Sequence, residues 1–189
     1  MASEVIKKFV DRFNISDQSM GSMSYLDFTS NASNLYAPIN GEAKEFYSCV
    51  KLEDTPTIGG DFYLQLFTAD EIENAQSGWT GPDDETLPWK KSFVLFGDRN
   101  GDAVVFDSAQ PLSPVYGSIQ KRSFLISTSF FSFLEALIIG IDVEEVEFSG
   151  DTREEDLSFK KNFLKKVEER LNVLGDAIDV EGFMKLFFM

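Results

Sequence analysis

The sequence has 189 residues, with no histidine and a single cysteine, Cys49. Without histidine there is no Ser-His-Asp or Cys-His catalysis, no histidine-ligated zinc or haem, and no proton transfer through imidazole. One cysteine excludes an internal disulfide and any metal site that needs several thiolates. Because no histidine can activate its thiol, we interpret Cys49 as a small buried hydrophobic residue.

Basic residues and long apolar runs are also scarce. Seventeen Lys and Arg stand against 32 Asp and Glu, which gives a net charge of −15. This charge argues against direct binding of nucleic acid or anionic lipid. The longest apolar stretch, residues 130–141, is interrupted by Ser132 and Glu135, so we expect no membrane span. Charges among the first residues, such as Glu4 and Lys7, do not fit a secretory signal, so we expect a cytoplasmic location.

Phosphate-binding and metal-binding motifs are missing as well. Neither Gly59-Gly60 nor Gly97 is followed by a pattern that cradles a nucleotide. Carboxylate pairs could in principle perform acid–base chemistry, but none lies in a recognisable pocket motif. We therefore expect no catalytic residue, no cofactor and no metal.

Periodicity of apolar residues and turn signals outline the secondary structure. We expect helices at 3–13, 41–52, 69–75, 130–139, 152–174 and 180–188, and strands at 62–67, 93–96, 104–107, 114–119 and 123–127. Capping boxes at Thr68–Glu71 and Thr152–Glu155 open two of these helices, and Gly140 and Gly175 are expected to end two. Residues 14–40 and 142–156 are expected to be connections. Strands that cluster, with helices around them, predict an α+β fold.

The loop at residues 98–102 allows two interpretations. Its carboxylate and amide oxygens at alternate positions resemble a calcium loop. However, Ala103 and Ala109 occupy the positions where an EF-hand needs its glycine and its bidentate glutamate. We favour a hairpin turn in which Asn100 and Gly101 adopt positive φ.

Acidic residues gather in two stretches. Residues 52–89 contain nine acids and no base, and residues 142–156 contain eight acids and one base. Such stretches are solvated surface, or they create a field that attracts a basic partner. Trp79 and Trp89 flank the acids Asp83, Asp84 and Glu85. Each tryptophan either packs in the core or anchors an interface.

Five short segments resemble the SUKH superfamily, which includes the yeast Smi and Knr cell-wall regulators and many bacterial immunity proteins. They are Ala-Lys-Glu-Phe-Tyr at 43–47, Leu-Phe-Thr-Ala-Asp-Glu-Ile at 66–72, the Gly-Asp stretch ending in Asp at 96–107, Pro-Val-Tyr at 114–116, and Ser-Phe-Phe-Ser-Phe-Leu at 129–134. The resemblance implies a central, mostly antiparallel sheet of about four to six strands surrounded by helices. The resemblance covers a core at about 37–143, and we expect one domain over 1–189 in which a helical segment at 1–36 and a helical extension at 151–189 flank that core.

The resemblance also implies a binding function without catalysis. We expect a bacterial immunity protein that occludes the active site of a polymorphic toxin, possibly a basic nuclease. The expected partner-binding residues are Trp79, Asp83, Asp84, Glu85, Trp89, Asp98 and Asp102. Two alternatives stay open: a housekeeping scaffold or regulator of the same fold, and an enzyme that uses carboxylates alone or a recruited metal. The apolar segment 180–188 must dock either on its own domain or on a partner, so both a monomer and a homodimer are compatible with the sequence.

Overall fold

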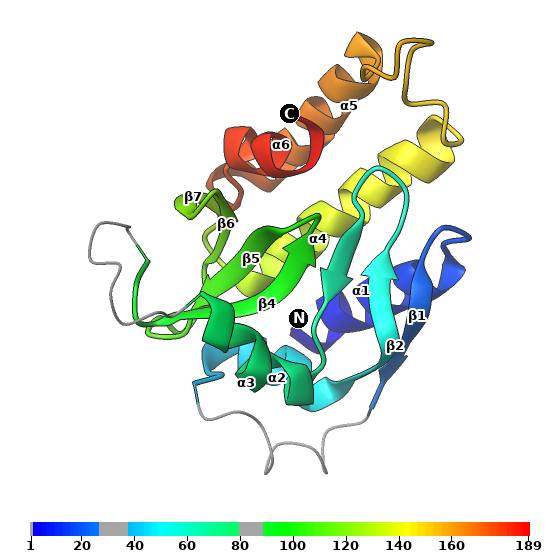
Figure 1. The fold of residues 1–189 in the computed structure, drawn as a ribbon. Helices are drawn as coiled ribbons and strands as arrows, with labels where there is room; N and C mark the ends of the chain where they lie inside the picture. The colour runs from blue at the N-terminus through cyan, green and yellow to red at the C-terminus, as the bar shows by residue number, and fades with distance from the viewer. Residues whose placement is uncertain (1, 27–37, 80–88) are drawn as a thin grey trace.

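The strands of the sheet follow one another in the order in which they occur in the chain (Figure 1). The computed structural model describes residues 2–26, 38–79 and 89–189. Each strand pairs antiparallel with the next, from the first to the seventh. The fold is therefore α+β, as predicted, with a sheet of seven strands.

The strands are β1 (Met20–Tyr25), β2 (Val50–Ile58), β3 (Leu64–Leu66), β4 (Phe93–Arg99), β5 (Asp102–Asp107), β6 (Val115–Ile119) and β7 (Arg122–Ser127). The α-helices are α1 (Ala2–Ile15), α2 (Gly41–Cys49), α3 (Ala69–Ala75), α4 (Phe130–Ile141), α5 (Lys161–Leu171) and α6 (Val180–Phe188). Two short 3₁₀ helices, η1 (Gln76–Gly78) and η3 (Asn172–Ala177), follow α3 and α5, and a π-helix, η2 (Asp142–Glu147), continues α4.

Strands β4 and β5 separate two apolar clusters because successive side chains of a strand point to opposite faces. The larger cluster contains Val94 and Phe96 of β4 and Val104 and Phe106 of β5, which point towards the helices. Helices from α1 to α6 also contribute side chains to this cluster. The smaller cluster takes the residues between them, namely Phe93, Leu95, Ala103 and Val105. Helices α1, α4, α5 and α6 thus cover one face of the sheet (Figure 1).

The β4–β5 hairpin has the predicted turn. Asn100 and Gly101 have φ values of 53° and 90°, and the Asp98 carboxylate accepts a hydrogen bond of 3.1 Å from the Gly101 N–H. Two consecutive residues of positive φ are typical of a type I′ turn. The oxygen of Asp98 that the calcium-loop interpretation would use therefore stabilises the turn itself.

The prediction was wrong in two places before residue 60. Residues 14–40 were expected to be a connection, but they include the end of α1 and the strand β1. The helix expected at 41–52 ends at Cys49, and Val50 begins a long strand. Lys51, Glu53 and Asp54 of this strand are exposed, so its sequence lacks the continuous apolar pattern of a central strand.

Gly140 does not end α4 as predicted but lies within it. A Cβ atom at this position would lie 2.4 Å from Cζ of the buried Phe62 ring. Glycine at position 140 therefore leaves space for the Phe62 ring. The helix continues past Gly140 into the π-helix η2.

The helix expected from Thr152 begins only at Lys161. The hydroxyl of Thr152 donates to the carboxylate of Asp61 instead of capping a helix. Leu157, which fitted the predicted apolar stripe, is 72% exposed. The true core residues of α5 are Phe163, Val167 and Leu171.

The apolar helix α6 packs on its own chain. Its rings Phe183, Phe187 and Phe188 are buried and lie within 6.2 Å of Phe62, centroid to centroid. Arg99 of β4 donates a hydrogen bond of 2.7 Å to the Phe187 carbonyl at the end of the helix. Within the described residues, no helix is both long and apolar enough to cross a membrane.

Candidate functional site

The two tryptophans that flank the acidic segment lie against each other. The rings of Trp79 and Trp89 stack with centroids 5.3 Å apart and an interplanar angle of 21°. Trp89 meets Phe93 edge to face at 5.7 Å, and Phe93 lies 4.9 Å from Tyr116. We call these four residues the aromatic face. They belong to the smaller cluster, on the face of the sheet opposite the larger cluster.

The segment that carries Trp79 is fixed to strand β4 by Gln76. Its side-chain amide donates to the Leu95 carbonyl at 2.9 Å and accepts from the Leu95 N–H at 3.0 Å. The preceding helix α3 begins with the predicted capping box between Thr68 and Glu71. These bonds hold Trp79, which is half-buried, in a fixed position at the end of η1.

An ion pair lies beside the aromatic face. The ammonium of Lys90 is 5.3 Å from the Phe93 ring centroid and 5.2 Å from that of Tyr116, and it is 3.3 Å from the Asp107 carboxylate. Burial acts to raise the pKa of Asp107, but hydrogen bonds from its neighbours outweigh it, and the pKa is lowered overall. The bonds come from Ser92, Gln110, the Ala109 N–H and Lys90. Asp107 is therefore an ionised structural residue at the base of this face.

The other predicted partner-binding residues do not join this face. Asp83, Asp84 and Glu85 lie outside the described residues. Asp98 and Asp102 lie at the turn end of the β4–β5 hairpin, whereas Trp89 contacts Phe93 at the other end of β4. At about 3.3 Å per residue, Phe93 and Asp98 are roughly 17 Å apart along the strand. The described tryptophans and the hairpin acids thus belong to different ends of the sheet.

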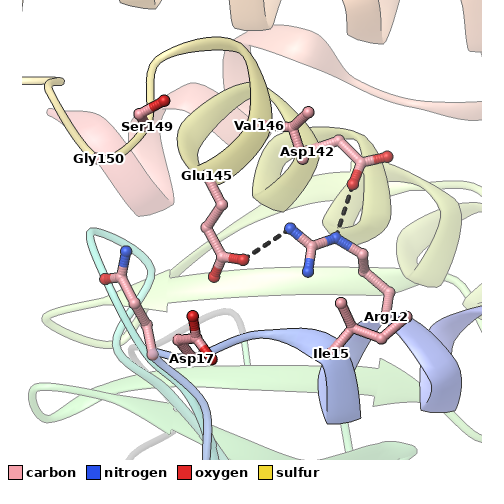
Figure 2. A pocket seen from close by; sticks show the side chains of 9 residues that line it. Arg12, Ile15, Asp17, Asp142, Glu145, Val146, Ser149 and Gly150 are labelled. Atoms are coloured by element: carbon pink, nitrogen blue, oxygen red, sulfur yellow. Dashed lines mark hydrogen bonds and ion pairs between the residues drawn. The ribbon is translucent and has the colours of Figure 1, made fainter.

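A groove that the sequence did not reveal lies where α1, the β2–β3 loop and the π-helix meet. It consists of two adjoining pockets of about 480 and 230 Å³ that share Gln18 and Gly150. We call it the π-helix groove. The larger pocket is lined by Arg12, Ile15, Asp17, Gln18, Asp142, Glu145, Val146, Ser149 and Gly150 (Figure 2). The smaller is lined by Gln18, Gly60, Asp61, Glu144, Gly150, Asp151, Thr152 and Arg153.

Arg12 fastens α1 to the π-helix across the larger pocket. Its Nε lies 2.6 Å from Asp142 and its terminal nitrogen 2.7 Å from Glu145 (Figure 2). The Ser16 hydroxyl donates to the other oxygen of Glu145 at 2.5 Å. These carboxylates are therefore occupied by the protein's own donors.

Glu144 is the least expected residue of the groove. It is 4% exposed, and its Oε1 accepts a hydrogen bond of 2.9 Å from the Asp61 N–H. Burial raises the pKa of Glu144 to about 7, and the nearby Asp61 and Glu145 add to this, while the Asp61 N–H and Arg153 oppose it. A Cβ on Gly60, whose φ is +62°, would lie 2.1 Å from Oε1, so only glycine leaves room for this carboxylate.

Asp61, in contrast, is fully engaged. Arg153 contacts its Oδ1 with two nitrogens, at 2.8 and 2.7 Å, and the Thr152 hydroxyl donates to Oδ2. Oε2 of Glu144 has no hydrogen-bond partner among the described residues. The groove thus presents one buried carboxylate with unused acceptor capacity, and this suits it to a hydrogen-bonding cation.

Only an indirect sign of this groove is visible in the sequence. The acid-rich stretch 142–156 contains Glu144, but nothing distinguishes it there from seven other acids. Its burial depends on the π-helix that contains it and on Gly60, which lies far away in the chain. Within the described ranges, no group of three or more Cys, Asp or Glu is arranged to hold a metal ion. Comparison of the chain with family models, curated proteins and solved structures found no match.

Proposed function

We propose that this chain is a non-catalytic protein-binding module of the SUKH type, acting as an immunity protein in the bacterial cytoplasm. It would capture a basic toxin, possibly a nuclease, and cover the toxin's active site without making or breaking a bond. Nuclease toxins need a basic cleft to hold phosphates, and an acidic protein can occupy that cleft in place of the substrate.

The observation that carries this proposal is the Trp79–Trp89 stack. Two half-buried tryptophans lie together with the smaller apolar cluster, on the face of the sheet opposite the larger one. They flank the acids Asp83, Asp84 and Glu85 in the sequence. Aromatic anchors with charge around them are typical of the centres of protein interfaces, and negative charge speeds the encounter with a basic partner.

The segments that resemble the SUKH superfamily support the proposal through their structure. Residues 66–72 form the end of a strand followed by a helix, and residues 96–107 form a hairpin whose second strand ends in the buried Asp107. Ser129 caps α4 by accepting a hydrogen bond from the Ser132 N–H. A housekeeping scaffold of the same fold is the second candidate, because the aromatic face would equally accept an endogenous partner.

The test is co-expression with the toxin encoded by a neighbouring gene. We expect the wild type to protect the cell and to co-purify with the toxin. Trp79→Ala should abolish or strongly reduce protection, because truncating a tryptophan at the energetic centre of an interface costs about 2 kcal/mol or more of binding free energy. Tyr63→Ala, which removes an aromatic side chain that is 53% exposed, is the matched control and should protect normally.

Two outcomes would contradict the proposal. If the wild type neither binds nor protects, the immunity function is wrong for that toxin, and a gene without any toxin or secretion neighbour favours the housekeeping candidate. If Trp79→Ala and Tyr63→Ala protect equally well while both remain folded by circular dichroism, the aromatic face is not the interface.

A further inference from the structure

Six acids line the π-helix groove, and four of them are already paired with a base. Asp142 and Glu145 pair with Arg12, Asp61 with Arg153, and Asp151 with Lys160. The remaining two, Asp17 and Glu144, form no salt bridge among the described residues, although Arg153 is near enough to favour the ionised form of Glu144. Asp17 is exposed and lines the larger pocket, whereas Glu144 is buried and lines the smaller one.

The larger pocket also carries apolar surface. Ile15 at the end of α1 and Val146 of the π-helix are 74% and 70% exposed, and both line this pocket. Large aliphatic side chains with this exposure, on either side of a charged depression, suit the methylene stem of a long basic residue and its apolar neighbours. In Figure 2 both belong to the same depression as Asp17 and Glu145.

We propose that the π-helix groove binds an arginine side chain from a basic segment of a protein partner, with the guanidinium directed to Glu144 and the neighbouring apolar residues packed on Ile15 and Val146. The inference rests on the proposed function in one respect, since the occupant belongs to a basic protein. It assigns a second contact surface, separate from the aromatic face.

Arginine fits the site better than other cations. Its planar guanidinium offers several N–H donors to a carboxylate oxygen that lacks one, and it is more weakly hydrated than an ammonium ion, so it enters a buried site at lower cost. Gly150 lines both pockets and Gly60 lines the smaller one, so neither residue has a side chain that narrows the groove.

Proton release should accompany binding. The pKa of Glu144 is about 7, and the charged groups around it are Asp61 in the β2–β3 loop, Glu145 in the π-helix and Arg153 in the segment that follows. A bound guanidinium favours the ionised carboxylate, so the affinity should rise with pH. The ionised fraction of such a group grows about tenfold between pH 6 and pH 8, and the affinity should rise by about the same factor.

The experiment is an NMR titration of the full chain with the peptide acetyl-Leu-Arg-Leu-amide. The citrulline peptide, which has the same shape without the charge, is the matched probe. We expect the amide signals of Gly60, Asp61 and Gly150 to shift with the arginine peptide and to respond at least tenfold more weakly to the citrulline peptide. The pH dependence should disappear in Glu144→Gln.

Two variants separate the site from general charge attraction. Glu144→Gln keeps the acceptor for the Asp61 N–H and should weaken binding at least tenfold. Glu155→Gln, an exposed acid outside the groove, removes the same charge and should change the affinity less than twofold. Val146→Ser, on a side chain that is 70% exposed, should weaken binding two- to fivefold without affecting the fold.

The proposal is overturned if the citrulline peptide binds as tightly as the arginine peptide, if Glu155→Gln weakens binding as much as Glu144→Gln, or if the shifted signals lie outside the groove. The two proposals also fail separately, because the titration uses no toxin. Full protection by Glu144→Gln in the co-expression assay would remove the groove from the toxin interface and leave the proposed function intact. If arginine binds at Glu144 in a chain that does not protect, the groove proposal is supported and the proposed function is contradicted.

Discussion

The carboxylate of Glu144 accepts a hydrogen bond from the backbone N–H of Asp61 at 2.9 Å, and this bond joins the π-helix to the loop between β2 and β3. The contact places an acid that is 4% exposed next to two further carboxylates. Ionisation of Glu144 therefore opposes folding, although its hydrogen bond supports it.

Stability should consequently fall at alkaline pH because of Glu144. Its folded pKa of about 7 lies above its ordinary value of 4.5, so its contribution is complete below pH 4.5 and is lost as the pH rises through 7. A shift of this size corresponds to about 3 kcal/mol. Urea unfolding at pH 5 and pH 8 should show this loss in the wild type. Glu144→Gln should remove it, whereas Glu155→Gln should retain it. An identical loss in both variants would contradict the assignment.

Asp107 should act in the opposite direction. Its folded pKa is lowered, so its contribution to stability is present above the ordinary pKa of an aspartate and is lost as the pH falls through the folded value. Asp107→Asn should lower the free energy of unfolding at pH 7 by about 1–3 kcal/mol, because buried donors lose a charged acceptor. The difference from the wild type should shrink in urea titrations towards pH 3. Asp11→Asn, at an exposed position of α1, is the control, and it should leave the free energy of unfolding unchanged at both pH values.

Gly140 should not tolerate alanine. In an ordinary helix this change stabilises by up to about 1 kcal/mol. Here the new Cβ would meet the Phe62 ring at 2.4 Å, and the ring is fully buried. We expect Gly140→Ala to lower the free energy of unfolding by about 1–3 kcal/mol. In combination with Phe62→Leu the penalty should largely vanish, and a double-mutant cycle measures this coupling. Additive effects would show that the ring does not determine the choice of glycine.

The Trp79–Trp89 stack has a spectroscopic consequence. Two indole rings with centroids 5.3 Å apart should couple their electronic transitions and give an exciton couplet in far-ultraviolet circular dichroism. Because the chain has no other tryptophan, either Trp79→Phe or Trp89→Phe should abolish the couplet. The replacement Phe93→Leu should keep it. A couplet that survives both tryptophan replacements would contradict the stacked arrangement.

The sequence predicted well those elements whose signals are local. The capping box at Thr68, the positive φ values at Asn100 and Gly101, and the apolar helix 180–188 depend on neighbours within one or two turns, and the structure contains all of them. Where the local structure depends on residues that are distant in the chain, the same kind of sequence signal led to a wrong prediction. Thr152 has the spacing of a cap, but Asp61 is present to take its hydroxyl.

The candidate sites show the same division. The sequence pointed to Trp79 and Trp89, because two tryptophans around an acidic segment are visible without a fold. Their stacking was not predictable, since it depends on Gln76 of η1 bonding to Leu95 of β4, which lies 19 residues further along the chain. The π-helix groove escaped prediction because its main feature, a buried Glu144, looks in the sequence like one more surface acid.

The position of α6 has a consequence for how the protein is made. Its rings complete the cluster around Phe62, and Arg99 holds its last turn through the Phe187 carbonyl. During synthesis on the ribosome, the apolar surface around Phe62 stays exposed on the earlier strands and helices until residues 180–188 have left the exit tunnel. The native state therefore cannot form until residues 180–188 have been made and released, and chaperones can engage the open apolar surface until then.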